Sequence, residues 1–338
     1  MQLFLDSYGA FLGVQNGMFW VKPKRSEGRA FAIREVNAIF LTKGVSMSSD
    51  AMALAVENSI PVLLLNGIGH PVAQIWSGQY GSISTIRKKQ ALFATDLQGV
   101  RWIREVLMQK MQQQTTQLAY WRESWGADTA TTNLLRKCVA GIDGIIFTMQ
   151  NWQYESQSFN EIAGAFRGWE GTATRYYFKG MAALLPPLYR FEGRSKRPAY
   201  DPFNALLNYL YGMLYAYVEL AQMKAGLDPY TGVLHADEYN RPTLVYDMIE
   251  IYRQWAERIA MELCINNRLP ADSFTETERE GVRLVSPGKG VVTDTFLAFL
   301  NDKTEYKSQV RKRLTHIDLD AIRLATSIKN FEPSIRII

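Results

Sequence analysis

Cysteine and histidine are scarce in this sequence, which limits the chemistry that it can carry out. The 338 residues include two cysteines and three histidines, without the spacing of a Cys/His zinc site. Cys138 and Cys264 both lie in apolar segments with a helical pattern, which predicts two buried thiols and fits a reducing compartment. No Ser/His or Cys/His set suits nucleophilic catalysis, so a covalent protein nucleophile is not expected.

Long apolar runs and targeting signals are absent as well. No stretch of about 18 apolar residues could cross a membrane. The N-terminus has no basic head followed by an apolar run and a small-residue cleavage site. We therefore expect a cytoplasmic protein.

Nucleotide-binding and recombinase motifs are not found either. Gly67 and Gly69 follow an apolar strand, but the third glycine of a dinucleotide-binding loop is missing and a strand follows, so a turn is the better interpretation. His70 beside them is interpreted as a turn residue. There is no Walker loop, and the last third of the chain lacks the spaced arginines and histidine that a tyrosine recombinase needs.

The composition is typical of a packed globular protein. Hydrophobic residues make up 47% of the chain and charged residues 21%, so disorder is not expected. The length allows one large domain or two ordinary ones. The formal net charge of +5 favours a polyanionic partner such as nucleic acid.

Short apolar runs separated by turn residues fill roughly the first 80 residues and predict strands. Asn16-Gly17 between two of these runs is a strong hairpin signal, because both residues tolerate a positive φ. A short helix is expected over 51–57. The expected strands cover 2–6, 10–14, 18–22, 30–33, 38–41, 60–65 and 71–76.

From Ser84 onward, apolar residues recur with a helical period. The sequence therefore predicts an α+β two-domain protein, with a small β-rich N-terminal domain at 1–82 and a large all-α domain at 83–338. Small polar residues near 77–85 are expected to link them. The expected helices cover 86–111, 130–147, 158–186, 201–226, 243–263, 293–301 and 318–328.

The residues with the clearest chemical potential lie near position 240. His235 falls in a loop between two long helical segments, and the next helix is expected to open around Pro242. That helix carries Asp247 and Glu250, which are three residues apart and so share a face. Two neighbouring carboxylates repel each other unless a cation lies between them. Two carboxylates and an imidazole suit Mg²⁺ or Mn²⁺ better than zinc.

Each of these acids also has an ordinary structural interpretation. Asp247 and Glu250 could form an exposed helix face, and Arg253 on the same helix is a candidate ion-pair partner of Glu250. A third acid, Glu170, lies among aromatic residues between two arginines that could pair with it. The sequence alone leaves these alternatives open.

Several motifs in order along the chain resemble the CRISPR-associated adaptation integrase family (the Cas-one family). The resemblance extends over essentially the whole chain and matches the predicted domain split. Its motifs are Gly44-Val45-Ser46-Met47-Ser48, Ile60-Pro61-Val62, Trp169-Glu170-Gly171 with Tyr176-Tyr177-Phe178, Arg197–Tyr209, Leu234-His235 and Arg241–Glu250.

The resemblance implies a β-sandwich-like N-terminal domain that dimerises and a helical catalytic domain. By position, Glu170, His235 and Glu250 would bind the Mg²⁺ or Mn²⁺ ion, and Asp247 would be a catalytic companion beside it. Glu250 stands where the family more usually has aspartate. Glutamate reaches one carbon further and is still an oxygen ligand.

The reaction implied is integration, in which the 3′-hydroxyl of a captured DNA fragment attacks a phosphodiester at a CRISPR repeat boundary. The implied partners are DNA, a second copy of the chain, and the small companion adaptation protein (Cas-two). Two further hypotheses remain: a stand-alone metal-dependent nuclease, and a non-catalytic DNA-binding scaffold.

Basic residues near the candidate site could hold DNA phosphates, with aromatic residues between them to stack on bases. A solvated loop is the alternative interpretation of the main cluster. The runs 87–89 and 311–313 are more ambiguous, and His316 after the second run is expected to be solvated near a helix end. The candidate DNA-binding residues are Arg167, Arg175, Arg190, Arg194, Lys196 and Arg197.

Overall fold

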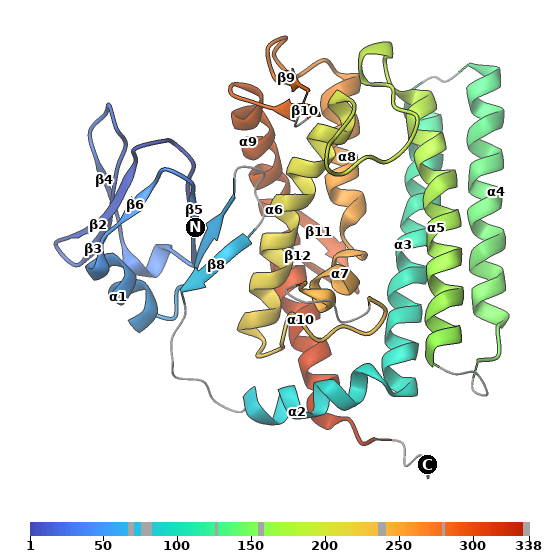
Figure 1. Ribbon diagram of the computed structural model, residues 1–338, viewed down its shortest axis with the longest axis horizontal. Coiled ribbons are helices and arrows are strands. Elements are labelled where there is room, and N and C mark those ends of the chain that lie inside the picture. The colour runs from blue at the N-terminus through green and yellow to red at the C-terminus, as the bar shows by residue number, and fades with distance from the viewer. Residues whose placement is uncertain are drawn as a thin grey trace. The chain divides into compact units, whose positions relative to one another are not determined.

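The chain forms two compact units, Met1–Ile83 and Ser84–Ile338 (Figure 1). The first is rich in strands and the second is helical, which confirms the predicted α+β class. The glycine turn at 67–69, His70 and most of the expected linker lie outside the described residues. The computed structural model describes residues 1–66, 71–75, 83–125, 128–154, 159–235, 241–278 and 281–333.

The described strands of the N-terminal unit form two four-stranded sheets. In the first, of order β1-β5-β7-β8, the first three strands are parallel and β8 is antiparallel to β7. In the second, of order β4-β3-β2-β6, β6 is parallel to β2 and the other pairs are antiparallel. The elements are β1 (Gln2–Leu5), β2 (Phe11–Gln15), β3 (Met18–Lys22), β4 (Arg29–Phe31), β5 (Ala38–Thr42), β6 (Ser46–Met47), β7 (Val62–Leu65), β8 (Pro71–Ile75) and helix α1 (Ser49–Glu57).

The turn between β2 and β3 confirms the predicted hairpin. Asn16 and Gly17 have φ values of 51° and 71°. Positive φ at both central positions is what a two-residue turn needs to match the twist of its strands. Gln15 is paired with Met18 as a result.

Both sheets and α1 contribute to one hydrophobic core. Leu12 and Phe19 come from the second sheet, Ile39 and Val62 from the first, and Ala51 from α1, and all five are fully buried. The N-terminal unit is therefore a two-layer structure whose sheets share their apolar faces.

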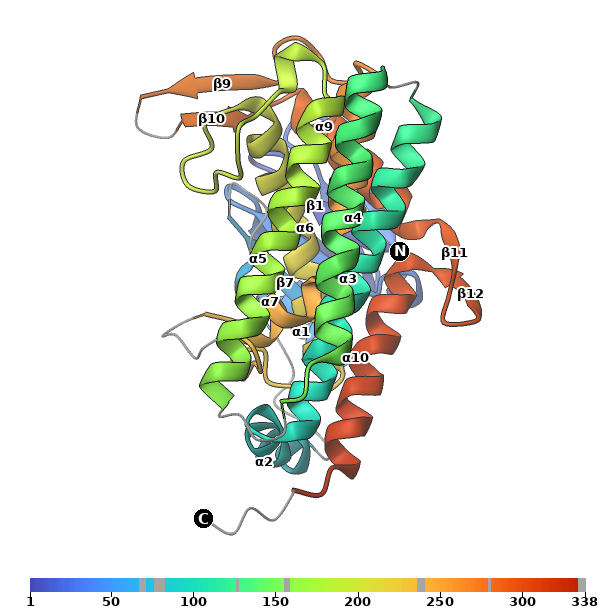
Figure 2. The same ribbon diagram turned by 90° about the vertical axis from the view of Figure 1, so that its right-hand side faces the viewer.

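The C-terminal unit is built from long helices. The helices α3, α4 and α5 pack side by side (Figure 2). Helix α6 is buried on nearly every face and contacts α7, α8 and α10, as expected for a helix that is apolar all round. The helices are α2 (Ile83–Ala94), α3 (Leu97–Ser124), α4 (Thr129–Asn151), α5 (Phe159–Leu184), α6 (Pro202–Lys224), α7 (Thr243–Ile249), α8 (Arg253–Ile265), α9 (Gly288–Asn301) and α10 (Arg313–Asn330).

Several features of this unit differ from the sequence predictions. The helix expected over 86–111 is divided into α2 and α3 at 95–96, and the helix expected over 243–263 is divided into α7 and α8 at 250–252. Two β-hairpins were not expected, β9 (Phe274–Thr277) with β10 (Gly281–Leu284) and β11 (Lys303–Tyr306) with β12 (Gln309–Lys312). His316, expected to be solvated, is instead fully buried, with its Nε2 3.0 Å from the carbonyl oxygen of Thr304.

Both cysteines are buried free thiols, as predicted. Among the described helices, none has both the length and the apolar character needed to cross a membrane.

The shared core of the N-terminal unit predicts a position-dependent loss of stability along β2. Leu12→Ala should lower the free energy of unfolding by about 2–5 kcal/mol, because it removes a fully buried side chain and leaves a cavity. Val14→Ala is the matched control, since Val14 lies on the same strand with 37% of its surface exposed. Calorimetric melting should separate the two variants. Equal effects would contradict the assignment of the core.

Candidate active site

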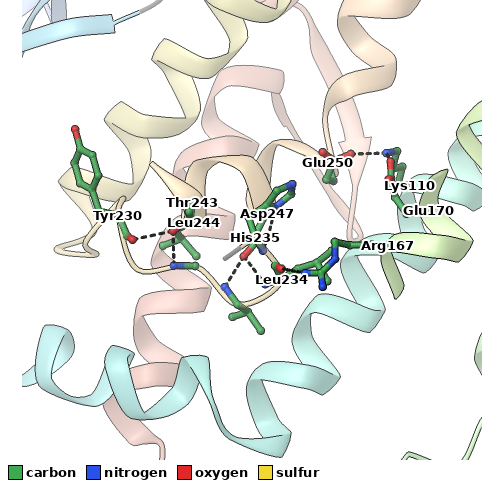
Figure 3. Close-up of polar contacts among 12 residues, drawn as sticks. Lys110, Arg167, Glu170, Tyr230, Leu234, His235, Thr243, Leu244, Asp247 and Glu250 are labelled. Carbon is green, nitrogen blue, oxygen red and sulfur yellow. Dashed lines mark hydrogen bonds and ion pairs between the residues drawn. The ribbon is translucent and has the colours of Figure 1, made fainter. Parts of the chain in front are cut away.

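Three helices of the C-terminal unit bring two carboxylates to one lysine (Figure 3). Lys110 comes from α3, Glu170 from α5, and Glu250 caps the C-terminus of α7. The Nζ atom of Lys110 forms ion pairs with Oε1 of Glu170 and, at 2.5 Å, with Oε2 of Glu250. Thr174, one turn after Glu170, donates a hydrogen bond of 3.0 Å to the same Oε1 atom. The two acids therefore converge on Lys110, which is buried, with 5% of its surface exposed.

A second cation approaches Glu250 from the other side. The Nε atom of Arg253 donates to Oε1 of Glu250 at 2.7 Å. The guanidinium is fixed in turn by a 3.0 Å hydrogen bond to the hydroxyl of Tyr215, and it lies 4.9 Å from the ring centre of Tyr211. Cation–π contacts of this kind are strongest where water is excluded. Arg253 is the first residue of α8 and lies three residues after Glu250, with its guanidinium beside the Glu250 carboxylate.

These ion pairs decide the charge state of the cluster. Burial by itself raises the pKa of Glu250, but the attraction of Arg253 and Lys110 outweighs it and holds that pKa at about 2. Burial also lowers the pKa of Lys110, whereas Glu250 and Glu170 raise it above its ordinary value. The carboxylate and the ammonium therefore both remain charged at neutral pH.

Asp247 has a different set of partners. It is fully buried and accepts the backbone N–H groups of Val233, Leu234 and His235 at 2.5, 3.1 and 3.2 Å. Its Oδ1 atom also lies 2.7 Å from Nδ1 of the His235 ring. A carboxylate accepts hydrogen bonds, so this contact places the ring proton on Nδ1 and leaves Nε2 with a free lone pair. Asp247 therefore positions the loop and orients its imidazole.

Further contacts hold the same loop in place. Arg167 donates a 3.2 Å hydrogen bond to the carbonyl of Leu234, and the backbone N–H of Gly232 donates to the hydroxyl of Thr243 at 2.9 Å. A Cβ atom at Gly232 would lie 2.7 Å from the backbone of Thr243 and 2.9 Å from Oδ2 of Asp247. The loop can pack this closely on α7 only because glycine has no side chain.

The structure separates the two acids that the sequence spacing placed together. Asp247 and Glu250 were expected to share one cation, but Asp247 turns to the loop and Glu250 turns to Lys110 and Arg253. No described cation of the chain itself pairs with both acids, and a divalent ion between them stays a prediction. Glu170 pairs with Lys110 and not with a neighbouring arginine, whereas the expected pairing of Arg253 with Glu250 is confirmed.

Lys110 was missed by the sequence analysis, although a signal was present. It falls on the buried face of α3, whose apolar members include Ile103, Leu107, Met111 and Leu118. A lysine on such a face is almost never fully buried without a partner. Its position therefore required an acid from another helix, but the sequence did not say which.

The donor set fits a hard divalent cation in its chemistry. Glu170 and Glu250 already converge on a positive charge, and the His235 side chain, which is 38% exposed, keeps Nε2 as a nitrogen ligand. Within the described part of the chain, no three His, Cys, Asp or Glu residues lie close enough together to hold a metal ion. The ammonium of Lys110 stands between the two carboxylates instead.

The six candidate DNA-binding residues divide into two groups. Arg194 donates hydrogen bonds to Oδ1 of Asn204 at 2.8 Å and to Oδ1 of Asn208 at 2.6 Å. Its guanidinium also lies over the ring of Tyr211. It therefore braces the loop in which it lies. The exposed members are Arg167, Arg175, Arg190, Lys196 and Arg197.

Lys196 is an exposed cation whose charge interacts with the acids of the site. Burial and the neighbouring charges of Arg253 and Arg194 lower its pKa, while Glu250 and Glu170 raise it. Its ammonium therefore shares the electrostatic field of the acid cluster. Of the aromatic residues in the same loop, Tyr200 is 74% exposed, whereas Tyr189 and Phe191 belong to the core.

Comparisons with known proteins identify sequence relatives over nearly the whole chain. A family model described as "CRISPR associated protein Cas1" matches residues 3–297. The chain is similar to CRISPR-associated endonuclease Cas1 1 of Archaeoglobus fulgidus, with 29% identity over 324 residues that cover 91% of each protein. A Thermus thermophilus protein of the same name is 27% identical over 331 residues, covering 97% of this chain and 96% of the relative.

Solved structures share the fold. A Cas1 protein from Thermotoga maritima superposes with a TM-score of 0.75 at 20% identity, covering 97% of both chains. A casposase bound to integration product has a TM-score of 0.78 at 18% identity, covering 98% of this chain and 92% of that chain. A chain of a Cas6-RT-Cas1–Cas2 complex has a TM-score of 0.80 at 19% identity, and this chain spans 35% of it.

The contacts of Asp247 predict that its main effect is on stability. Asp247→Asn should lower the free energy of unfolding by about 1–3 kcal/mol, because an amide nitrogen replaces an acceptor of buried N–H groups. His235→Ala should change it by less than about 0.5 kcal/mol, since the ring is partly exposed. Denaturant unfolding of both variants tests this. A larger loss for His235→Ala would show that the imidazole, and not Asp247, holds the loop.

Proposed function

The chain belongs to the Cas1 family of CRISPR-associated proteins, and on this premise we propose that it is a metal-dependent DNA integrase that also acts as an endonuclease. In its reaction, the 3′-oxygen of a short DNA fragment would form a new bond to the phosphorus of a phosphodiester at a CRISPR repeat. The bond from that phosphorus to the 3′-oxygen of the repeat strand would break, and this oxygen would leave as a hydroxyl after taking up a proton. The observation that carries this proposal is the convergence of Glu170 and Glu250 on one cation, with His235 oriented by Asp247 on the neighbouring loop. Acids and an imidazole held in this way are the donors of a phosphoryl-transfer site.

Glu170, Glu250 and Nε2 of His235 would hold the metal ion. A bound Mg²⁺ or Mn²⁺ would withdraw charge from the scissile phosphate and favour the deprotonated form of the attacking hydroxyl. Asp247 keeps the imidazole in the tautomer that can serve as a ligand. Because His235 would act as a neutral ligand, the proton of the attacking hydroxyl passes to solvent or to a DNA phosphate.

The fixed cations around the acids suit a polyanionic substrate. Arg253 already balances the charge of Glu250, so a divalent ion added to the two glutamates would leave the site with excess positive charge. A phosphodiester would neutralise this excess. Lys196, which shares the field of the acid cluster, would act on the same phosphate. Metal and DNA are therefore expected to bind more tightly together than separately.

The binding of DNA beyond the reacting phosphate would use the exposed basic residues. Arg167 and Arg175 lie on α5 with Glu170, and Arg190 and Arg197 lie in the segment before α6. Tyr200, with an exposed ring, would stack on an unpaired base. Such contacts hold DNA without reading its sequence.

The partners expected for this function are a second copy of the chain and the Cas2 protein. One of the solved structures that share the fold is a Cas6-RT-Cas1–Cas2 complex, and another is a casposase bound to integration product. The N-terminal unit, with two sheets around its own core, would form the dimer contact. Size-exclusion chromatography with light scattering, with and without Cas2, measures both associations.

Loss of the ligands should abolish strand transfer. On branched DNA that mimics a half-joined intermediate, the protein should reverse the joining in the presence of Mn²⁺, and Glu170→Ala and His235→Ala should each reduce the rate at least about 100-fold. Glu161→Ala is the control, because Glu161 is an exposed glutamate on the same helix. Full activity in Glu170→Ala and His235→Ala would contradict the site.

The same substrates separate integration from simple hydrolysis. A fragment with a 3′-dideoxy end has no attacking hydroxyl, so it should block joining and leave nicking unchanged. Nicking without any joining of normal fragments, with Cas2 present, would favour a stand-alone nuclease. Binding without either activity would favour a DNA-binding scaffold.

The two groups of basic residues should respond differently to mutation. Arg197→Ala should reduce the salt dependence of DNA binding by about one unit of slope in a plot of log K against log salt, as expected for one lost phosphate contact. Arg194→Gln should mainly lower the melting temperature, because its donors bind Asn204 and Asn208. Fluorescence anisotropy at several salt concentrations, together with melting curves, measures both effects. An unchanged slope for Arg197→Ala would remove it from the DNA-binding set.

A further inference from the structure

The position of Lys110 bears on how a metal ion enters the site. Its ammonium contacts Oε1 of Glu170 and Oε2 of Glu250, so it occupies the space between the two carboxylates (Figure 3). These are the acids that the proposed function assigns to the metal. A divalent ion held by these two acids would compete with this ammonium for their negative charge.

Both oxygens of Glu250 already face a cation, Arg253 at Oε1 and Lys110 at Oε2. A metal ion held by Glu250 would be repelled by both cations, so its binding favours the displacement of one of them. Arg253 is fixed by the hydroxyl of Tyr215 and by the ring faces of Tyr211 and Tyr215. Lys110 carries a point charge on a flexible four-carbon chain, so it moves at a lower cost than a stacked guanidinium.

We propose that Lys110 is a resident cation that holds Glu170 and Glu250 close together until a divalent metal ion displaces it. Without a cation between them, the two neighbouring carboxylates would repel each other. With it, the two glutamates stay near each other before the metal arrives. The metal binds in competition with an internal ion pair, so its measured affinity is lower than that of the vacated site.

This inference rests on the proposed metal site and adds to it Lys110, the residue that the metal ion displaces. The alternative is that Lys110 stays between the acids when metal binds, as a fixed part of the electrostatic field. Lys196 distinguishes these cases, because its charge also acts on Glu170 and Glu250 through space. Removing Lys196 changes the field, whereas removing Lys110 changes the field and also vacates the position between the carboxylates.

Binding of Mn²⁺ to the full-length protein, followed by the electron paramagnetic resonance signal of free Mn²⁺, tests the proposal. Lys110→Met should bind Mn²⁺ at least about tenfold more tightly than the wild type, because affinity falls in proportion to the fraction of time that a site is available. Lys196→Met should change the affinity by less than about threefold, since a more exposed charge is screened by solvent and salt. Equal or weaker binding by Lys110→Met, or an equal gain in both variants, would overturn the displacement of Lys110.

Glu170→Gln and Glu250→Gln keep the failure of this inference distinct from failure of the proposed function. If both weaken Mn²⁺ binding while Lys110→Met matches the wild type, the metal site stands and the displacement is wrong. If Mn²⁺ binding is unchanged in both, the ion lies elsewhere and the proposed function fails with the inference.

A measurement on the wild type covers the case in which Lys110→Met does not fold. Only 5% of the Lys110 surface is exposed, so an amine-reactive reagent should modify it slowly in metal-free protein. Addition of Mn²⁺ should raise the modification of Lys110 several-fold in mass spectra and leave that of exposed lysines unchanged. Protection of Lys110 that does not change with Mn²⁺ would overturn the proposal.

Discussion

Two cations hold the buried carboxylate of Glu250. Lys110 reaches it from α3 and Arg253 reaches it from the start of α8. Removing one partner of a buried ion pair is strongly destabilising, because it leaves an uncompensated charge. The packing of α3, α5, α7 and α8 at this point is therefore tied to the charge balance of the acids.

The two acids around α7 have separate tasks although they are three residues apart. Asp247 accepts hydrogen bonds from the backbone of the 233–235 loop and from the His235 ring. Glu250 follows the last residue of α7, where the chain leaves the helix and begins α8. The backbone of Glu250 is still helical, with φ −55° and ψ −31°. The two acids therefore differ in the partners that their side chains find: Asp247 contacts the loop, and Glu250 contacts Lys110 and Arg253.

Much of the fold could be predicted from the sequence. The strands of the N-terminal unit follow from short apolar runs, and the β2–β3 turn follows from Asn16-Gly17, whose backbone requirement is local. The long helices follow from their apolar period. The break at 250–252 could not be predicted, because apolar residues continue through it without glycine or proline. The two hairpins of the C-terminal unit are short and polar, and they gave no periodic signal.

The candidate site was only partly predictable. The family resemblance pointed to Glu170, His235, Asp247 and Glu250, but residue spacing alone supported only the last two and gave them a shared cation that the structure does not show. The ion pairs of Lys110 are contacts between helices that are far apart in sequence, and residue spacing does not predict such contacts. Arg194 had the same charge as its neighbours in sequence, and only its contacts with Asn204 and Asn208 reveal an internal role.

The central claim is that Glu170, Glu250 and His235 bind one metal ion, with the two glutamates held near each other by Lys110 until the metal binds. Anomalous diffraction at the manganese edge, from crystals of the full-length protein grown with Mn²⁺, tests it most directly. The account predicts a single strong peak about 2.0–2.6 Å from an oxygen of each glutamate and from Nε2 of His235. A peak at other residues, or its absence from this position at saturating Mn²⁺, would contradict the account.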